Sequence, residues 1–318
     1  QLGNIAGQEE KLYLRPETAQ GIFVNFLNVQ KTTRQKIPFG IAQIGKAFRN
    51  EIVARQFIFR MREFEQMEMQ FFIAPGTELD WFEKWKAQRM KWHLALGTPA
   101  NKLKFKDHDN LAHYANAATD IQFEFPFGFK ELEGIHSRTD FDLKSHQELS
   151  GKKLTYFDQE KNEAYVPYVV ETSIGADRMF LAMLSNNLKE ESVPDSKGED
   201  STRLVFKIHP ALAPVKCAVL PLVKNKEELT SKAKTIYDKL KLQFQCQYDD
   251  KDAIGRRYRR QDAIGTPICI TVDFETLDDN CVTVRDRDTL VQQRVPIEKL
   301  SAIIAEKTDM SKVLDQLV

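Results

Sequence analysis

The sequence predicts an α/β (α+β) protein of two domains, an antiparallel-sheet domain followed by a small α/β domain with a mixed sheet. Residues 39–72 alternate polar and apolar side chains with the period of two that marks β-strands, in two runs joined by a loop. Residues 217–295 alternate strand-like and helix-like patterns, which is typical of an α/β domain. The charged stretch 189–205 has few apolar residues and predicts a linker or exposed loop. We therefore expect domains at 1–188 and 206–318.

The composition limits the partners and the compartment. The 318 residues carry 46 basic and 46 acidic side chains, so the formal net charge is zero and any RNA contact must come from local patches. The four cysteines lack CxxC spacing, which fits reduced thiols in a cytoplasmic protein better than disulfides or zinc. No apolar run approaches the roughly 18 residues of a membrane span. We expect neither a membrane nor DNA as a partner.

The first predicted helix directly follows a carboxylate. The sequence begins at Gln1 without an initiator Met and leads into a strand-like run at 11–17. From Thr18 to Val29 the apolar residues recur at helical spacing, and Thr18 is the expected N-cap. Glu17 either compensates the helix dipole or binds a ligand, and the residues alone favour the structural role.

The predicted hairpin at 39–72 has one apolar and one polar face, because side chains two positions apart share a face. The polar face would collect Gln43, Gly45, Ala47, Arg49 and Glu51 from the first strand and Arg62, Phe64, Gln66, Glu68 and Gln70 from the second. Arginine forks bind phosphate, a phenylalanine ring can stack on a nucleobase, and small residues leave room for a ligand. This face therefore suits a nucleotide, and a solvated face with incidental ion pairs is the alternative.

Further helices and strands are expected between the hairpin and residue 150. They are a tryptophan-rich helix that begins with the capping-box residues Thr77 and Asp80 and ends near Gly97, a strand at 102–106, a helix at 110–119 and a strand at 121–129. Four histidines fall in or after this region, but they lack the spacing that zinc ligands favour: His108, His113, His136 and His146. The sequence therefore gives little support to a metal role for them.

Residues 166–184 predict a buried strand, a glycine turn and a helix. Glu171 and Ser173 project to the same face of the strand, and Arg178 falls at the helix N-terminus. An arginine is unfavourable at the positive end of a helix unless an anion is near. A bound phosphate would relieve this conflict, and a salt bridge to a neighbouring carboxylate such as Asp177 is the alternative.

The second predicted domain contains a basic and aromatic cluster. Its expected elements are strands at 217–222, 244–248, 268–273, 282–286 and 290–295 and a helix at 226–242. The cluster comprises Arg256, Arg257, Tyr258, Arg259 and Arg260. Cations with an interleaved aromatic ring suit single-stranded RNA, and a solvated helix face is an equally good interpretation.

Four stretches together carry a resemblance to a known family. They are LRPETAQGIFVNF (14–26), FRNE (48–51) with REFEQME (62–68), GIHSRTDFDL (134–143) and ETSIGADR (171–178). With these, the chain resembles the class II aminoacyl-tRNA synthetases, and among them the glycyl-tRNA synthetases of the dimeric type, over nearly its whole length. The resemblance implies a class II synthetase antiparallel-sheet catalytic domain followed by the anticodon-binding domain that the glycyl, prolyl, threonyl and histidyl enzymes share.

The resemblance also implies an activity and a set of site residues. The activity is ATP-dependent ligation of glycine to tRNA(Gly) through a glycyl-adenylate, with Mg2+ as a further cofactor and Arg49 and Arg178 as catalytic cations. The implied ATP-binding residues are Arg49, Glu51, Arg60, Arg62, Phe64 and Arg178, and the implied glycine-binding residues are Glu17, Glu68, Arg138, Glu171 and Ser173. The protein ligands of magnesium stay open, with Glu160, Glu163 and Glu171 as candidates.

Two other functions compete with this one. A sister synthetase for proline, threonine or histidine would share the anticodon-binding domain, and a non-catalytic synthetase-like accessory protein would share the scaffold. Accessory proteins tend to lose the phosphate-binding arginines, whereas Arg49 and Arg178 are both present. The family's first motif, which builds the homodimer interface, would precede Gln1. We therefore expect a truncated sequence and do not extend the homodimer to it.

Overall fold

The computed structural model describes residues 13–194 and 200–317. Contacts divide the chain into two compact units, the first formed by 1–94 and 98–182 and the second by 95–97 and 183–318. The division falls inside helix α4 (Ala176–Asn187).

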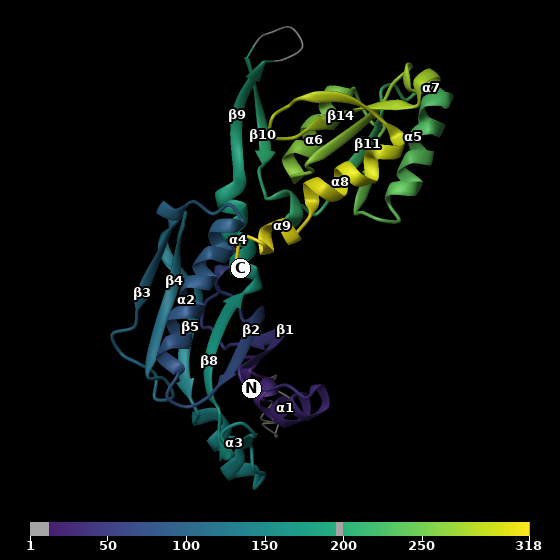
Figure 1. Cartoon of the computed structure of the whole chain (residues 1–318). Coiled ribbons are helices and arrows are strands. Elements are labelled where there is room, and N and C mark those ends of the chain that lie inside the picture. The colour runs from purple at the N-terminus through teal and green to yellow at the C-terminus, as the bar shows by residue number, and fades with distance from the viewer. Residues whose placement is uncertain (1–12, 195–199, 318) are drawn as a thin grey trace, which may run out of the picture. The chain divides into compact units, whose positions relative to one another are not determined.

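The first unit is built on one six-stranded antiparallel sheet (Figure 1). In the order β1-β2-β8-β5-β4-β3, its strands are Phe39–Phe48, Glu63–Ile73, Tyr168–Gly175, Gly128–Thr139, Ala117–Phe125 and Leu103–Asp107. The accompanying elements are helices α1 (Ala19–Thr33), α2 (Glu78–Ala95) and α3 (Phe141–Ser150) and the small hairpin of β6 (Tyr156–Asp158) and β7 (Glu163–Tyr165).

Helices cover different parts of the two faces of this sheet. On one face, Trp81 and Trp85 of α2 pack against Phe71 of β2 and a core of buried apolar residues. On the other face, Phe23 and Phe26 of α1 pack against the end of the sheet that carries Phe39 and Phe72. The remainder of that second face is polar, so it stays available for a pocket.

The hairpin predicted at 39–72 is confirmed, and so is its shared polar face. Ala47 lies opposite Phe64, Gly45 opposite Gln66 and Gln43 opposite Glu68 in the antiparallel ladder, and directly opposite residues share a face. The polar face is buried more deeply than expected of charged strands: Gln70 is fully buried and Glu68 is 4% exposed. Buried polar groups need partners, and they find them in the pocket described below.

The second unit contains a five-stranded mixed sheet. In the order β12-β11-β13-β14-β15, its strands are Cys246–Tyr248, Cys217–Pro221, Ile268–Val272, Cys281–Asp286 and Gln292–Pro296, of which the first three are parallel. The helices are α5 (Glu227–Leu240), α6 (Ile254–Ile264), α7 (Thr276–Asp279), α8 (Leu300–Thr308) and α9 (Ser311–Leu314). The predicted fold class, an antiparallel sheet followed by a small mixed α/β sheet, is confirmed.

Three local predictions are wrong. Residues 110–116 are turns rather than a helix, because the chain from Ala117 onward is drawn into β4 beside β5. The stretch 189–205 is not a simple linker: β9 (Leu188–Pro194) and β10 (Asp200–Phe206) pair as an antiparallel hairpin. Their charges pair across the ladder, as Arg203 contacts Glu191 at 2.7 Å. Charge pairing of this kind lets a polar sequence form strands.

The segment before α1 also differs from the expected strand. Residues 13–17 have no strand structure, although the amide of Phe48 donates to the carbonyl of Arg15 at 2.9 Å. Residues 1–12, which include the start of that expected strand, lie outside the described part of the chain. Among the described residues, no helix combines the length and the apolar character needed to cross a membrane.

Candidate active site

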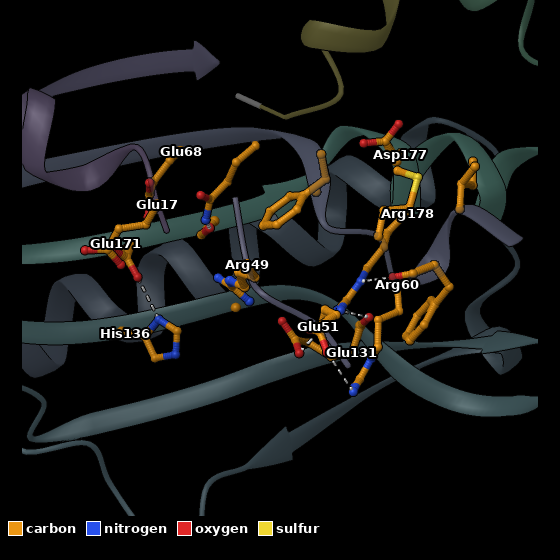
Figure 2. Close-up of a pocket in the computed structure, with 18 of the residues that line it drawn as sticks. Glu17, Arg49, Glu51, Arg60, Glu68, Glu131, His136, Glu171, Asp177 and Arg178 are labelled. Carbon is orange, nitrogen blue, oxygen red and sulfur yellow. Dashed lines mark hydrogen bonds and ion pairs between the residues drawn. The ribbon is translucent and has the colours of Figure 1, made fainter. Parts of the chain in front are cut away.

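A pocket lies on the polar face of the first unit's sheet (Figure 2). Every residue predicted to bind ATP or glycine lines it except Arg62. Glu17, Glu68 and Glu171 form its acidic end. Arg60 and Arg178 lie at the opposite, cationic end beside the carboxylates of Glu51, Glu131 and Asp177, and Arg49 lies between the two ends. The sequence predicted that small residues of β1 leave room for a ligand. At Gly45 they do not, because the guanidinium of Arg15 fills the space above this residue.

Glu171 is the buried anion of the acidic end. It is 3% exposed, and its oxygens accept hydrogen bonds from Arg138 Nη1 at 2.8 Å and Gln70 Nε2 at 2.6 Å. His136 Nδ1 lies 2.9 Å from its other oxygen. Burial alone would raise the pKa of Glu171, but the His136 contact and the charge of Arg138 outweigh it and lower the pKa to about 2. Glu171 is therefore ionised, and Nδ1 of His136 donates to it.

Glu68 is the neutral acid of the same end. It lies opposite Ser173 in the ladder of β2 and β8, and its Oε2 accepts hydrogen bonds from the Thr18 amide at 3.1 Å and the Thr18 hydroxyl at 2.5 Å. Thr18 thus occupies the predicted N-cap position, but its side chain bonds Glu68 rather than the helix. Burial first, and the charge of Glu171 second, raise the pKa of Glu68 to about 8. Two adjacent buried carboxyls share one negative charge in this way.

Arg138 anchors the anion. Its Nε and Nη2 donate to the two oxygens of Asp142 at 2.8 and 2.9 Å, while Nη1 donates to Glu171. Its guanidinium carbon lies 4.2 Å from the ring centre of Tyr114. The side chain is 3% exposed, so contact with a substrate carboxylate would require it to exchange one of these partners.

Arg178 sits at the start of α4, as predicted, and it is held in place. Its Nε donates to the carbonyl of Phe59 at 3.2 Å, and Nη1 lies 3.3 Å from a carboxylate oxygen of Glu131. Its guanidinium carbon lies 4.3 Å from the Phe59 ring centre. The alternative partner, Asp177, instead accepts a hydrogen bond from the amide of Glu65.

Glu131 is a pocket residue that the sequence did not predict. Simple alternation along β5 places it on the face opposite His136. The ladder with β4 instead shifts, so that Glu133 lies opposite Ile121 and Glu131 opposite Gln122. This irregularity passes over Leu132 and returns Glu131 to the pocket face, which the sequence pattern alone does not reveal.

The nucleotide residues predicted from the hairpin separate into two groups. Arg49 lies beyond the end of β1, exposed, with its guanidinium carbon 5.2 Å from the ring centre of Phe64. Arg60 lines the pocket and lies 3.6 Å from Glu51. Arg62 does not line it, because its guanidinium donates to the carbonyls of residues 51 and 52 and so holds the loop.

Two stretches of the chain match known protein families. Residues 5–187 match the family described as "tRNA synthetase class II core domain (G, H, P, S and T)", and residues 216–307 match "Anticodon binding domain". The first match covers more than half of the chain. The chain belongs to the class II tRNA synthetase family.

Individual relatives are closely similar. The chain is 56% identical over 307 residues to a protein of Chlorobaculum tepidum named "Glycine--tRNA ligase", a match that covers 96% of this chain and 64% of that protein. Proteins of the same name from Agathobacter rectalis and Geobacillus kaustophilus are 55% and 56% identical, with 93% of this chain covered in both cases and 63% and 64% of their own lengths. The chain thus spans a little under two thirds of these relatives.

In the anticodon-binding domain of this synthetase chain, the basic cluster 256–260 lies on α6. Arg257 is 1% exposed and donates to the carbonyls of residues 221 and 222 at the end of β11 and of residue 249 after β12. The Tyr258 hydroxyl contacts Thr271. The other neighbours are Ser201 for Arg259 and two carboxylates, Asp249 and Asp252, for Arg260. Arg256 is the cluster's most open cation, with 78% of its side chain exposed.

The raised pKa of Glu68 makes the stability of the catalytic unit depend on pH. Because the folded-state pKa of about 8 exceeds the ordinary 4.5, the stabilisation is complete below pH 4.5 and is lost as the pH rises to about 8. We expect the free energy of unfolding to fall between about pH 4.5 and pH 8, and to fall less in Glu68→Gln. All three tryptophans lie on α2, so urea unfolding followed by tryptophan fluorescence monitors this unit.

Glu65→Gln is the matched control for this measurement, since it removes an exposed carboxylate from the same strand outside the pocket. Its unfolding free energy should change with pH as that of the wild type does. Identical pH profiles for the wild type and Glu68→Gln would show that Glu68 carries no extra proton.

Proposed function

We propose that this chain supplies the catalytic and anticodon-binding parts of a ligase that uses ATP to attach glycine to tRNA(Gly) through a glycyl-adenylate. The observation that carries the proposal is the pocket with an acidic and a cationic end, which suits an ammonium group next to phosphates. The names of the relatives support glycine as the amino acid. We further propose the cytoplasm as the compartment, where aminoacylated tRNA is used. The family homodimer stays a prediction.

In the first step, a carboxylate oxygen of glycine attacks the α-phosphorus of ATP. A carbon–oxygen–phosphorus link forms, the bond to the β-phosphate oxygen breaks, and pyrophosphate leaves with the electron pair. Negative charge gathers on phosphoryl oxygens, so the protein has to supply cations and alignment rather than a nucleophile. Arg49 faces the α-phosphate, while Arg178 and Arg60 hold the outer phosphates. Phe64 stacks on adenine, and Glu51 orients its amino group. In the second step, a terminal ribose hydroxyl of tRNA attacks the carbonyl carbon of the adenylate. An ester bond forms, the bond from that carbon to the phosphate oxygen breaks, and AMP leaves with the electron pair while the hydroxyl proton passes to the released phosphate or to water.

The acidic end recognises the glycine ammonium group. Glu171 is already ionised, and Glu68 gives up its proton when the cation arrives, because a positive charge next to a carboxyl lowers its pKa. Ser173 completes the wall, and its hydroxyl accepts a hydrogen bond from Gln66 Nε2 at 2.7 Å, which fixes its position. Arg138 steadies the substrate carboxylate by exchanging one of its two contacts with Asp142 for it, while its contact with Glu171 is kept. The side chains fill the space of a β-carbon, so only glycine fits.

We propose Glu131 as the protein ligand of magnesium in place of Glu160, Glu163 or Glu171, the candidates from the sequence. Glu160 pairs with Lys36 outside the pocket, and Glu163 lies on β7. Glu171 already has three partners. Glu131, half-exposed at the cationic end, has the oxygen ligands that Mg2+ prefers. Glu131 would hold the ion, and bound magnesium would neutralise charge on the phosphates.

The exchange of pyrophosphate into ATP tests the proposed amino acid directly. We expect exchange with glycine and not with proline, threonine, histidine or alanine, and we expect Arg49→Ala to lower it at least about a hundredfold. Ser173→Gly should open the wall and admit alanine more readily, whereas Glu65→Gln, outside the pocket on the neighbouring strand β2, should leave the ratio of glycine to alanine unchanged. Exchange with another amino acid would support a sister synthetase, and no exchange with any would support an accessory protein.

We propose that the anticodon-binding domain contacts tRNA phosphates through Arg256 rather than Arg257. Arg256 is exposed, whereas Arg257 uses its donors on backbone carbonyls. We expect Arg256→Ala to reduce the slope of log affinity against log salt by about one unit, while glycine-dependent exchange is spared. Arg256→Lys keeps the charge and should keep the slope. An unchanged salt slope in Arg256→Ala would remove this contact from the proposal.

A further inference from the structure

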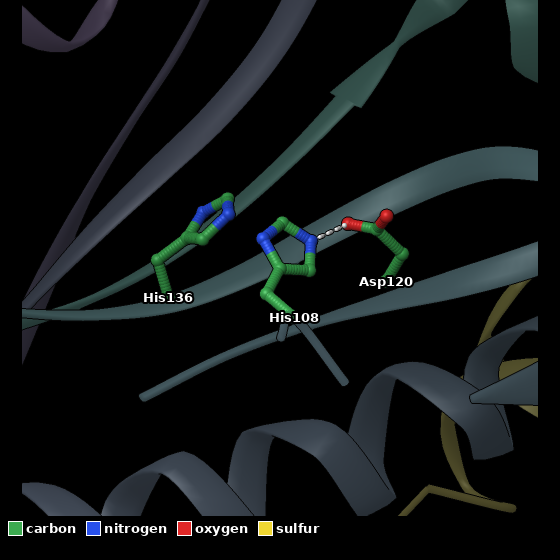
Figure 3. A group of neighbouring side chains, drawn as sticks. All are labelled: His108, Asp120 and His136. Carbon is green, nitrogen blue, oxygen red and sulfur yellow. Dashed lines mark hydrogen bonds and ion pairs between the residues drawn. The ribbon is translucent and has the colours of Figure 1, made fainter. Parts of the chain in front are cut away.

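Three possible metal ligands from neighbouring strands converge beside the pocket (Figure 3). His108 directly follows β3, Asp120 lies on β4 and His136 on β5. One ligand atom from each side chain lies within 4.8 Å of the other two. Among the residues that the structure describes, these three form the one group of at least three His, Cys, Asp or Glu side chains that could hold a metal ion.

The sheet register explains this convergence. Asp120 lies opposite Gly134, and Ala118 lies opposite His136, so the side chains of Asp120 and His136 project from the pocket face. The amide of His108 donates to the carbonyl of Ala118 at 3.1 Å. The register therefore brings His108 to the same end of the sheet. These long-range contacts connect residues whose sequence spacing gave no sign of a metal site.

Two imidazoles and a carboxylate form a ligand set that suits zinc. Catalytic and regulatory zinc sites keep three protein ligands with water in the fourth position. His108 Nε2 lies 2.9 Å from Asp120 Oδ1, and the two imidazole rings lie 5.7 Å apart between centres. Tetrahedral zinc with bonds of about 2.0–2.1 Å needs ligand atoms roughly 3.3 Å apart, so modest side-chain rotations close the site. All three side chains keep some exposure, from 16% to 31%, which admits the ion and its water.

The surroundings of His136 add a second, independent observation. Its Nδ1 contacts Glu171, which leaves Nε2 for a metal, and a carboxylate on the far nitrogen is the usual support of a metal-binding histidine. Gly134 provides space for the ring, since a Cβ at that position would lie 2.8 Å from His136 Cε1. A histidine held by its far nitrogen and given room by a glycine is pre-oriented toward the other two ligands.

We propose that His108, Asp120 and His136 bind one zinc ion, completed by water, at the border of the pocket. The proposal does not depend on the amino acid or on the reaction. Because the same histidine contacts Glu171, an ion on Nε2 fixes the proton on Nδ1 and holds Glu171 in the orientation seen here. Zinc would therefore favour the acidic end as the structure shows it.

Titration of the full chain with Co2+, a coloured substitute for zinc, tests the site. We expect one ion per chain with the intense visible absorption of a four-coordinate site, displaced by Zn2+ but not by Mg2+, which prefers oxygen ligands. His108→Ala and Asp120→Asn should each weaken binding at least about tenfold. The matched control is His113→Ala, which removes an imidazole packed on Phe141 outside the group and should bind as the wild type does.

Tryptophan fluorescence during urea unfolding verifies that each variant is folded. Asp120→Asn preserves shape, so loss of binding in that variant with unchanged unfolding supports a ligand role. The proposal is overturned if Co2+ gives no four-coordinate spectrum. It is equally overturned if His108→Ala and Asp120→Asn bind as tightly as the wild type, or if His113→Ala loses as much affinity as they do.

Discussion

The contact between Arg138 and Glu171 is the interaction on which the pocket depends. Glu171 lies in a central strand and is 3% exposed, and a buried carboxylate without a partner would take up a proton or destabilise the fold. His136 and Arg138 together prevent both, and Asp142 on α3 in turn holds Arg138 from the other side. The chain thereby ties β8, β5 and α3 together around one fixed negative charge. With this charge in place, Glu68 next to it has to stay neutral.

The two ends of the pocket come from different structural sources. The acidic end is rigid, since Glu68 and Glu171 stand on paired central strands and their partners lie on α1, β5 and β2. The cationic end is assembled from strand ends and a helix start, where Arg49 and Arg60 are exposed. A small substrate needs a wall that does not yield, whereas a long, flexible nucleotide is better served by side chains that can close on it. The central strands of the sheet supply the rigid wall, and the strand ends and the helix start supply the side chains that can close on the nucleotide.

The sequence predicted much of this arrangement because period-two alternation persists through β1 and β2 and specifies their register. It could not predict Glu131, since one irregular residue in β5 reverses the alternation, nor the strands at 188–206, whose charges are matched only once the hairpin forms. The helix predicted at 110–119 does not form, because the pairing of β4 with β5 is a long-range effect that local sequence does not reveal. Arg257 shows a different limit: a basic run does not reveal which of its members donate to the protein's own carbonyls. The convergence of His108 on His136 has the same long-range origin.

We propose that the acid pair of Glu68 and Glu171 carries one proton in the free protein and exchanges it for the substrate ammonium. Calorimetry of glycine binding near pH 7 in two buffers with different ionisation enthalpies measures that proton directly. Since the pKa of Glu68 is about 8 in the free protein, we expect nearly one proton to be released for each glycine bound, and little release in Glu68→Gln. If glycine bound to the wild type with the same heat in both buffers, no proton would leave, and the proposed exchange of the Glu68 proton for the ammonium group would be wrong.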